Sequence, residues 1–405
     1  MSFELKRFTR DGSDALEQHL QQTCTRVLAG VRALIPDRRR DGLVLGGGYG
    51  RGEGGVLRTP DGDQPYNDLE FYVLVRGNAL LAERRFRRAL HELGEQLSPA
   101  AGLEVEFKVL TLNKLRRSPP SMFYYDLVMG HRWITGDAPA RSGGESPAPT
   151  GVGTARPHAP MDALLAACPQ HGEATRIPLY EATRLLMNRC SGLLFALVRL
   201  TGPTFTDADA DFTGRNLAKA QLAFGDVLLA AQGQYHWSCL ERQRRLAQFD
   251  FTPLPWAVPL KAHHAAGVEF KLHPTRSTES RAVLAARHQE LCALGGQLWL
   301  WLEARRLARP FATARDYAVS TVDKCPETAP LRNRLVNGRA FGMAGLASNR
   351  YPRERLLHAL ALLLWEKSAL TDPALRAVIQ ASLRTPAGDL AGLVSAYSKI
   401  WERFN

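Results

Sequence analysis

Hydrophobic positions in the first third of the chain follow two spacings. Over residues 13–34, and again over 78–97, apolar residues recur every three or four positions, which predicts two helices. Three shorter segments, at residues 43–45, 68–75 and 103–112, are continuously apolar or alternate between apolar and polar residues, which predicts strands. Helices interleaved with strands favour a small mixed sheet that is covered by helices.

Beyond residue 176 the pattern is helical throughout. Residues 138–160, just before, are rich in Pro, Gly, Ser and Ala and have little periodicity, as linkers do. The strongest helical spacings fall at residues 178–200, 215–232, 277–307, 353–367 and 389–404. The sequence therefore predicts an α+β fold, with a mixed-sheet domain at residues 1–137, a linker or flexible insertion at 138–176, and an all-helical domain at 177–405.

The composition is that of a folded protein with more than one domain. The 405 residues exceed one ordinary core, and 45% hydrophobic with 23% charged residues exclude a disordered chain. No apolar run reaches the length of a membrane span, and the first residues lack the apolar stretch of a secretory signal. The six cysteines have no paired spacing that would suggest disulfides or a zinc site. We therefore expect a cytoplasmic protein with no membrane partner.

The basic residues raise the question of a nucleic-acid partner. The formal net charge is +12, but the arginines are spread along the chain, and only residues 38–40 and 84–88 form clusters. A solvent-exposed helix face explains the second cluster about as well as RNA binding does. Charge alone therefore leaves an RNA partner open without favouring it.

A glycine-rich segment is the first sign of specific chemistry. Residues 47–53 read Gly-Gly-Tyr-Gly-Arg-Gly-Glu and follow an apolar strand, where the backbone N–H groups of a turn can converge on an anion. Asp68 and Glu70 lie two residues apart on the next strand, so their side chains point to the same face. Two carboxylates beside such a turn can hold a divalent cation against the phosphates of a nucleoside triphosphate.

Two other glycine motifs do not fit these residues. A P-loop places Lys and then Ser or Thr after its glycines, whereas this chain continues Gly54-Gly55-Val56. A dinucleotide-binding fold places an acidic residue at the end of an apolar strand, where it binds a ribose hydroxyl. Here Asp68 and Glu70 open the strand, which suits metal ligation better.

The glycines and the carboxylates together resemble a known motif. Gly47-Gly48 and Asp68-Leu69-Glu70-Phe71 resemble the motif of the DNA polymerase beta-like nucleotidyltransferase superfamily, with a longer gap between the two parts. Residues 58–65 look like a turn inserted in that gap. The glycine segment also resembles the turn of bacterial protein uridylyltransferases and of small antibiotic nucleotidyltransferases. The resemblance extends to about residue 115.

This resemblance implies a magnesium-dependent enzyme. Such an enzyme transfers a nucleoside monophosphate from a nucleoside triphosphate to a hydroxyl group and releases pyrophosphate, with two Mg²⁺ ions held by three carboxylates. It assigns Asp68 and Glu70 as catalytic metal ligands and expects a third carboxylate on a later strand. Glu106 is our choice, because its apolar neighbours match the third position of the family, and Glu104 is the alternative.

The resemblance also implies ligands for the phosphates. The backbone of Gly47 and Gly48 and the guanidinium of Arg51 would bind the β- and γ-phosphates, since a guanidinium matches phosphate oxygens in pairs. In related enzymes the helical domain often contributes a lysine to the triphosphate. Lys219, on a helix that is otherwise apolar on nearly every side, is the candidate here.

The acceptor is predicted to be a small molecule or a protein side chain, because the arginines are dispersed. An enzyme that adds nucleotides to an RNA end is the alternative, and it would bind RNA with an affinity that falls steeply with salt. A third hypothesis is a non-catalytic regulator that binds nucleotide. It is disfavoured because Asp68 and Glu70 are both present.

Overall fold

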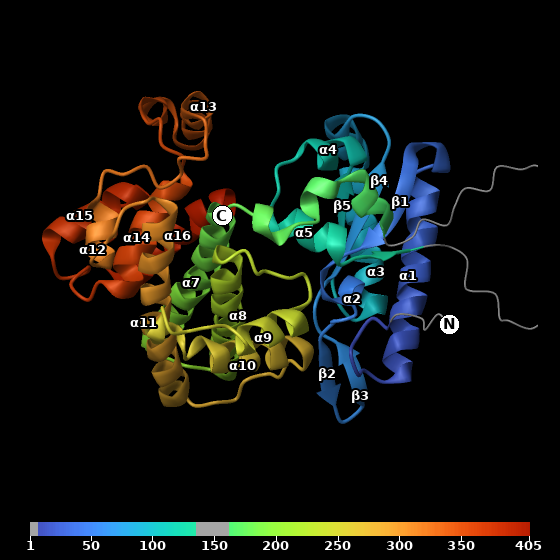
Figure 1. Ribbon diagram of the computed structural model, residues 1–405, viewed down its shortest axis with the longest axis horizontal. Helices are drawn as coiled ribbons and strands as arrows, with labels where there is room; N and C mark the ends of the chain where they lie inside the picture. The colour runs from blue at the N-terminus through green and yellow to red at the C-terminus, as the bar shows by residue number, and fades with distance from the viewer. Residues whose placement is uncertain (1–6, 135–161) are drawn as a thin grey trace, which may run out of the picture. The chain divides into compact units, whose positions relative to one another are not determined.

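The computed structural model describes residues 7–134 and 162–405, which divide into two compact units (Figure 1). Within the predicted linker, residues 138–161 lie outside the described residues, and from Asp162 onward the chain forms the short helix α6 (Asp162–Ala167). The first unit comprises Met1–Arg176, His236–Cys239 and Lys271–Thr275, and the second comprises Ile177–Tyr235, Leu240–Phe270 and Arg276–Asn405.

The first unit is built on a four-stranded mixed sheet with the strand order β5-β4-β1-β6. β1 pairs antiparallel with both β4 and β6, while β4 pairs parallel with β5. The parallel pair is joined by the helix α3 (Ala79–Ala101), as a parallel connection requires. The strands span Arg40–Leu45 (β1), Leu69–Val75 (β4), Val105–Leu110 (β5) and Arg132–Trp133 (β6). The strands predicted from the alternating pattern are thus confirmed.

The two faces of this sheet are covered by different helices. Because side chains alternate along β4, Leu69, Phe71 and Val73 pack in one core with α1 (Asp14–Leu34) and α3. Tyr72 and Leu74 belong to a second core on the opposite face. That second core is completed by side chains of three short helices, α4 (Leu112–Arg117), α5 (Met122–Met129) and α6. The same alternation decides which way the polar residues of β4 point.

Besides the fourth strand β6 and the short helices α4 to α6, which the sequence does not predict, two features of the first unit differ from the sequence prediction. The segment predicted as an inserted turn is a two-stranded hairpin, β2 (Val56–Thr59) and β3 (Gly62–Pro65). The sequence Gly-Asp-Gln-Pro of β3 has no apolar alternation, so no strand pattern was visible. The glycine segment predicted as a turn forms the short helix α2 (Gly47–Arg51).

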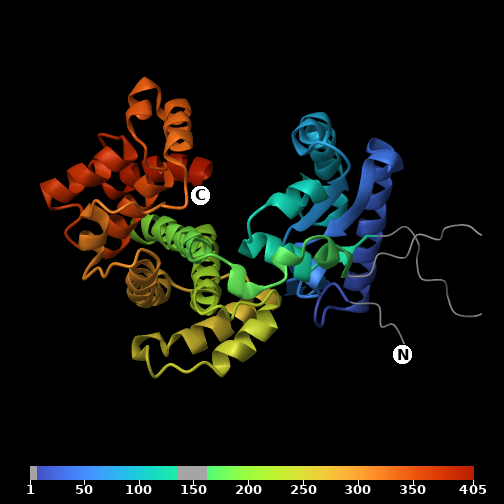
Figure 2. The ribbon, with the colours of Figure 1, turned by 45° about the horizontal axis from the view of Figure 1, so that its top comes forward.

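The second unit consists of helices (Figures 1 and 2). α7 and α8 pack side by side, and both carry runs of buried residues. α8 begins at Asp207, earlier than predicted, because Thr206 and Asp209 form a capping box at its N-terminus. The helices from α7 onward are Leu179–Thr201, Asp207–Ala231, Cys239–Ala247, Leu260–Leu272, Arg281–Arg306, Ala314–Val319, Pro330–Phe341, Arg353–Trp365, Pro373–Leu383 and Leu390–Phe404.

The observed architecture confirms the predicted α+β class, with a small mixed sheet early in the chain and helices after it. Within the described ranges, no helix is both long and apolar enough to cross a membrane. Short 3-10 helices complete the structure at Asp37–Arg39, Pro169–His171, Ala174–Arg176, Pro255–Ala257 and Met343–Ala347.

Candidate metal centre

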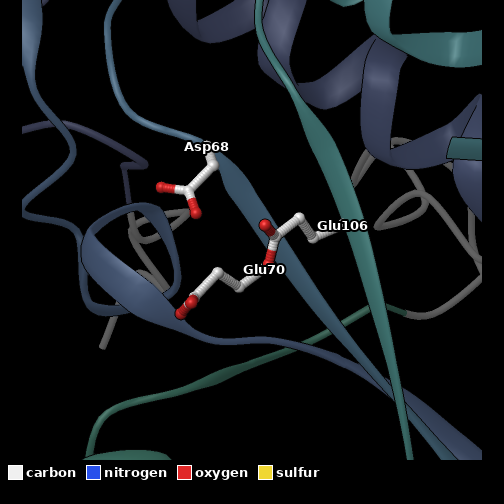
Figure 3. Close-up of side chains that lie close together, drawn as sticks. All are labelled: Asp68, Glu70 and Glu106. Carbon is white, nitrogen blue, oxygen red and sulfur yellow. The ribbon is translucent and has the colours of Figure 1, made fainter. Parts of the chain in front are cut away.

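Three carboxylates gather where β4 and β5 begin (Figure 3). Glu70 on β4 is the register partner of Glu106 on β5, so the parallel pairing places their side chains next to each other. Asp68 directly precedes β4, on the same face as Glu70 because it is two residues away. One carboxylate oxygen from each residue lies within 4.8 Å of those of the other two. We refer to Asp68, Glu70 and Glu106 as the carboxylate cluster.

The register of β5 distinguishes the two glutamates that the sequence left open. Glu104 precedes β5, is exposed, and accepts the Leu69 N–H through its backbone oxygen at 2.9 Å. Among the described residues it does not belong to the carboxylate cluster, whereas Glu106 does. Glu106 is therefore the third carboxylate on geometry.

The core side of β4 explains why the carboxylates are held in place. Leu69 lies between Asp68 and Glu70, and Phe71 follows Glu70. Both apolar side chains are fully buried and anchor the strand in the core. Phe71 also stacks on Phe107 of β5, with the ring centroids 5.7 Å apart. Because buried apolar residues alternate with the acids along the strand, turning the acids to the other face would move the apolar side chains out of the core.

Helix α2 lies against the carboxylate cluster. Gly47, its first residue, has φ of 61°, and a Cβ there would lie 3.1 Å from Oε2 of Glu70. The N–H of Gly46 donates to the backbone oxygen of Glu70 at 2.9 Å, and the N–H of Glu53 donates to the oxygen of Gly48 at 2.9 Å. The first N–H groups of a helix lack intrahelical acceptors. The glycines therefore bring a helix start and a carboxylate closer together than side chains would allow.

Lys108 is a member of the site that sequence reasoning missed. Its Nζ donates to Oε1 of Glu70 at 3.0 Å and lies 3.5 Å from Oε2 of Glu106. In register it is opposite Tyr72, and its Nζ is 5.7 Å from the centre of that ring. The signal was present, because Lys108 follows Glu106 by two residues and so shares its face.

The charges of the cluster act on one another. Desolvation and the negative charges of Glu70 and Glu106 raise the pKa of Asp68 above its usual value. Partial burial alone would lower the pKa of Lys108, but its contacts with Glu70 and Glu106 outweigh burial and raise it. Tyr72 donates its hydroxyl to Oε2 of Glu70 at 3.3 Å. The three carboxylates therefore repel one another and together attract the ammonium of Lys108.

The predicted phosphate ligands have different surroundings. The side chain of Arg51 is only 12% exposed, and its Nη1 lies 3.5 Å from Oδ2 of Asp126 on α5. Lys219 is exposed on α8 in the second unit. Gly47 lies beside Glu70 of the cluster, while phosphate binding by Gly47, Gly48, Arg51 and Lys219 stays a prediction.

Glu53, the last residue of the glycine segment, is held by side chains and backbone from distant parts of the chain. It accepts hydrogen bonds from the Ser238 hydroxyl and, at 3.0 Å, from the Cys239 N–H, and Nζ of Lys271 is 3.9 Å away. Burial alone would raise the pKa of Glu53, but Lys271 and these hydrogen bonds lower it. All these residues belong to the first unit, although two of its segments come from late in the chain. No local pattern could have linked them to Glu53.

The arginine cluster at residues 84–88 lies on α3. Arg87 pairs with Glu83 at 2.9 Å and Arg88 with Glu92 at 2.7 Å, both one helical turn apart and exposed. These two pairs are those of a solvated helix face, while an RNA partner stays untested. α3 and β5 also line a surface groove that includes Glu104, Glu106 and Phe107.

The comparisons with known proteins returned no match to this chain among protein-family models, curated proteins or solved structures. Three oxygen-donor side chains within reach of one ion are the ligands that Mg²⁺ and Mn²⁺ prefer.

Proposed function

We propose that this protein is a magnesium-dependent nucleotidyltransferase. It transfers a nucleoside monophosphate from a nucleoside triphosphate to a hydroxyl group of a small molecule or a protein, and it releases pyrophosphate. One observation carries the proposal: Asp68, Glu70 and Glu106 come from adjacent strands and lie within 4.8 Å of one another, beside a glycine-rich helix start. The order of these parts along the chain is that of the DNA polymerase beta-like superfamily it resembles.

The donor set of the carboxylate cluster fits Mg²⁺. All three ligands are carboxylates, Glu70 and Glu106 are half-buried, and Asp68 is exposed, so a hydrated ion can reach them. Asp68 and Glu70 would hold the ions, with Glu106 as the third ligand. When bound, magnesium supplies charge neutralisation for the phosphate oxygens and activates the attacking hydroxyl.

The residues of this chain position the reactants. The start of α2 at Gly47 and Gly48 offers backbone N–H groups to the triphosphate, close to Glu70. Glu106 is the carboxylate best placed to accept the proton of an acceptor hydroxyl, because it also lines the groove between α3 and β5. An acceptor in that groove would approach the phosphorus from the β5 side of the cluster.

The groove supports a small or peptide-like acceptor over RNA. Its lining includes residues of both charge signs, such as Arg84, His91, Glu95 and Glu104. A polyanion is bound by an excess of positive charge, and this groove has none. Mixed charges suit an acceptor that itself carries both signs.

One experiment tests the function directly. The protein is incubated with each α-labelled nucleoside triphosphate, Mg²⁺ and a cell extract, beside an Asp68→Ala/Glu70→Ala control. We expect metal-dependent label in a protein or small-molecule fraction and none with the control. Label that enters RNA would replace the acceptor class. An absence of both transfer and pyrophosphate release with every nucleotide would exclude catalysis.

A further inference from the structure

The position of Lys108 changes the charge of the carboxylate cluster. Three carboxylates and one ammonium lie together, because Nζ of Lys108 is 3.0 Å from Glu70 and 3.5 Å from Glu106. Two negative charges then remain, which a single divalent ion neutralises. A three-carboxylate site without the lysine would have a net charge of about −3 and would attract a second ion strongly.

From this geometry we propose that Lys108 takes the place of one divalent ion, so that the protein without nucleotide binds a single metal ion at Asp68, Glu70 and Glu106. The inference rests on the proposed function, since it assumes that the cluster binds metal. It goes further by stating how many ions the protein binds alone and which residue sets that number.

The fold holds Lys108 in this position. The parallel register places Lys108 beside Tyr72 and one pleat beyond the Glu70 and Glu106 pair, on the same face. The ring of Tyr72 lies 5.7 Å from Nζ, a distance at which an aromatic face attracts a cation. The ammonium therefore has three favourable neighbours at this place, and two of them are proposed metal ligands.

A competing explanation is that Lys108 only protects an exposed sheet edge. β5 is an edge strand of the four-stranded sheet, and lysines on edge strands discourage pairing with other chains. That role requires a charged side chain in solvent, with no particular partner. It predicts no effect of Lys108 on the number or affinity of bound ions, so metal binding separates the two explanations.

The test uses Mn²⁺ alone, without nucleotide, on the full chain. Binding is followed by isothermal titration calorimetry and by the electron paramagnetic resonance signal of free Mn²⁺. The variants are Lys108→Met, which keeps the length of the side chain, and Lys108→Arg, which keeps the charge. Lys114→Met is the matched control, because Lys114 is an exposed lysine on α4 outside the cluster.

We expect one Mn²⁺ per chain for the wild type, for Lys108→Arg and for Lys114→Met. For Lys108→Met we expect a second Mn²⁺ per chain, because a repelling charge is removed. A melting curve for each variant confirms that it is folded before binding is measured.

Two results would overturn the inference in different ways. If the wild type binds Mn²⁺ and Lys108→Met has the same stoichiometry, Lys108 does not take the place of an ion, and the proposed function stands. If none of the folded variants binds Mn²⁺, the cluster is not a metal site, and the inference fails together with the proposed function.

Discussion

Two groups of acidic side chains in this protein have opposite electrostatic characters. In the second unit, Asp226 is buried on α8, and its Oδ1 accepts a hydrogen bond from Nε of Arg242 at 2.6 Å. Nε2 of His264 lies 2.9 Å from the same oxygen. Burial alone would raise the pKa of Asp226, but Arg242 and His264 outweigh it and lower the pKa. The carboxylate of Asp226 thus has two partners of opposite charge character, a guanidinium and an imidazole.

The carboxylate cluster in the first unit has the reverse balance. Three carboxylates share one ammonium, that of Lys108, and the pKa of Asp68 is raised because of desolvation and its acidic neighbours. An acid that is paired with opposite charges, such as Asp226, stabilises the fold. Acids that repel one another lower the stability of the fold unless a bound ligand neutralises them. The balance of charge around an acidic side chain thus distinguishes an acid that stabilises the fold from one that belongs to a binding site. Each variant that follows alters either the carboxylate cluster or the group around Asp226.

The largest effect is expected from neutralising the cluster. Asp68→Asn/Glu70→Gln keeps the side-chain shapes and removes two of three charged ligands. We expect Mn²⁺ binding to be lost and metal-dependent pyrophosphate release to fall by roughly 10³-fold or more, since single electrostatic contacts in active sites contribute about 10²–10³-fold. Calorimetry and a pyrophosphate assay measure the two effects.

The same double variant should not be less stable than the wild type, because it removes repulsion. Its melting temperature, compared at neutral pH, provides the control. A clear loss of stability would mean that Asp68 and Glu70 stabilise the fold as Asp226 does. The two acidic groups would then not differ in their effect on stability.

Asp226→Ala tests the other side of the comparison. Removing this carboxylate breaks its buried ion pair with Arg242, and breaking such a pair typically costs about 3–5 kcal/mol of unfolding free energy. Denaturant unfolding measures the loss. We expect Mn²⁺ binding by the folded variant to be unchanged, and weakened metal binding at full stability would contradict a supporting role.

Much of this architecture could be predicted from short-range patterns. The sheet, the helices that cover it and the common face of Asp68 and Glu70 all follow from periodicity, which reports local structure. The hairpin β2–β3 was missed because its strands are short and its second strand has no apolar alternation. Strand periodicity places Lys108 on the face of Glu106, but it does not show that the ammonium reaches Glu70 on the neighbouring strand.

Long-range partners set the limit of prediction. The resemblance assigns Arg51 to phosphate, and it gives no sign that the guanidinium lies beside Asp126, whose position depends on how α5 packs. Glu53 is satisfied by Ser238 and Lys271, about two hundred residues away in the chain. Such pairs leave no periodic signal, because only the folded chain brings them together.

Gly47→Ala is expected to have a moderate effect on both stability and metal binding. At φ of 61° an alanine costs about 1–2 kcal/mol, and its Cβ would lie 3.1 Å from Oε2 of Glu70, so the carboxylate must shift. Gly62→Ala is the matched control, because Gly62 has φ of 116° with nothing within 4 Å of a Cβ. Both variants should lose stability in denaturant unfolding, and only Gly47→Ala should bind Mn²⁺ more weakly. Equal Mn²⁺ affinities would separate Gly47 from the site.

The smallest effect concerns pH and should have opposite signs in the two regions. Folded Asp68 keeps its proton to higher pH than the unfolded chain, so its contribution to the free energy of unfolding falls as pH rises above 3.8. Asp226 has a lowered pKa, so its contribution is present above pH 3.8 and is lost as pH falls through the folded value. Unfolding free energies of wild type, Asp68→Asn and Asp226→Asn across the acid range measure both. Wild type minus Asp68→Asn should decrease with rising pH, and wild type minus Asp226→Asn should increase. Slopes of the same sign would show that the two acids do not differ in charge balance.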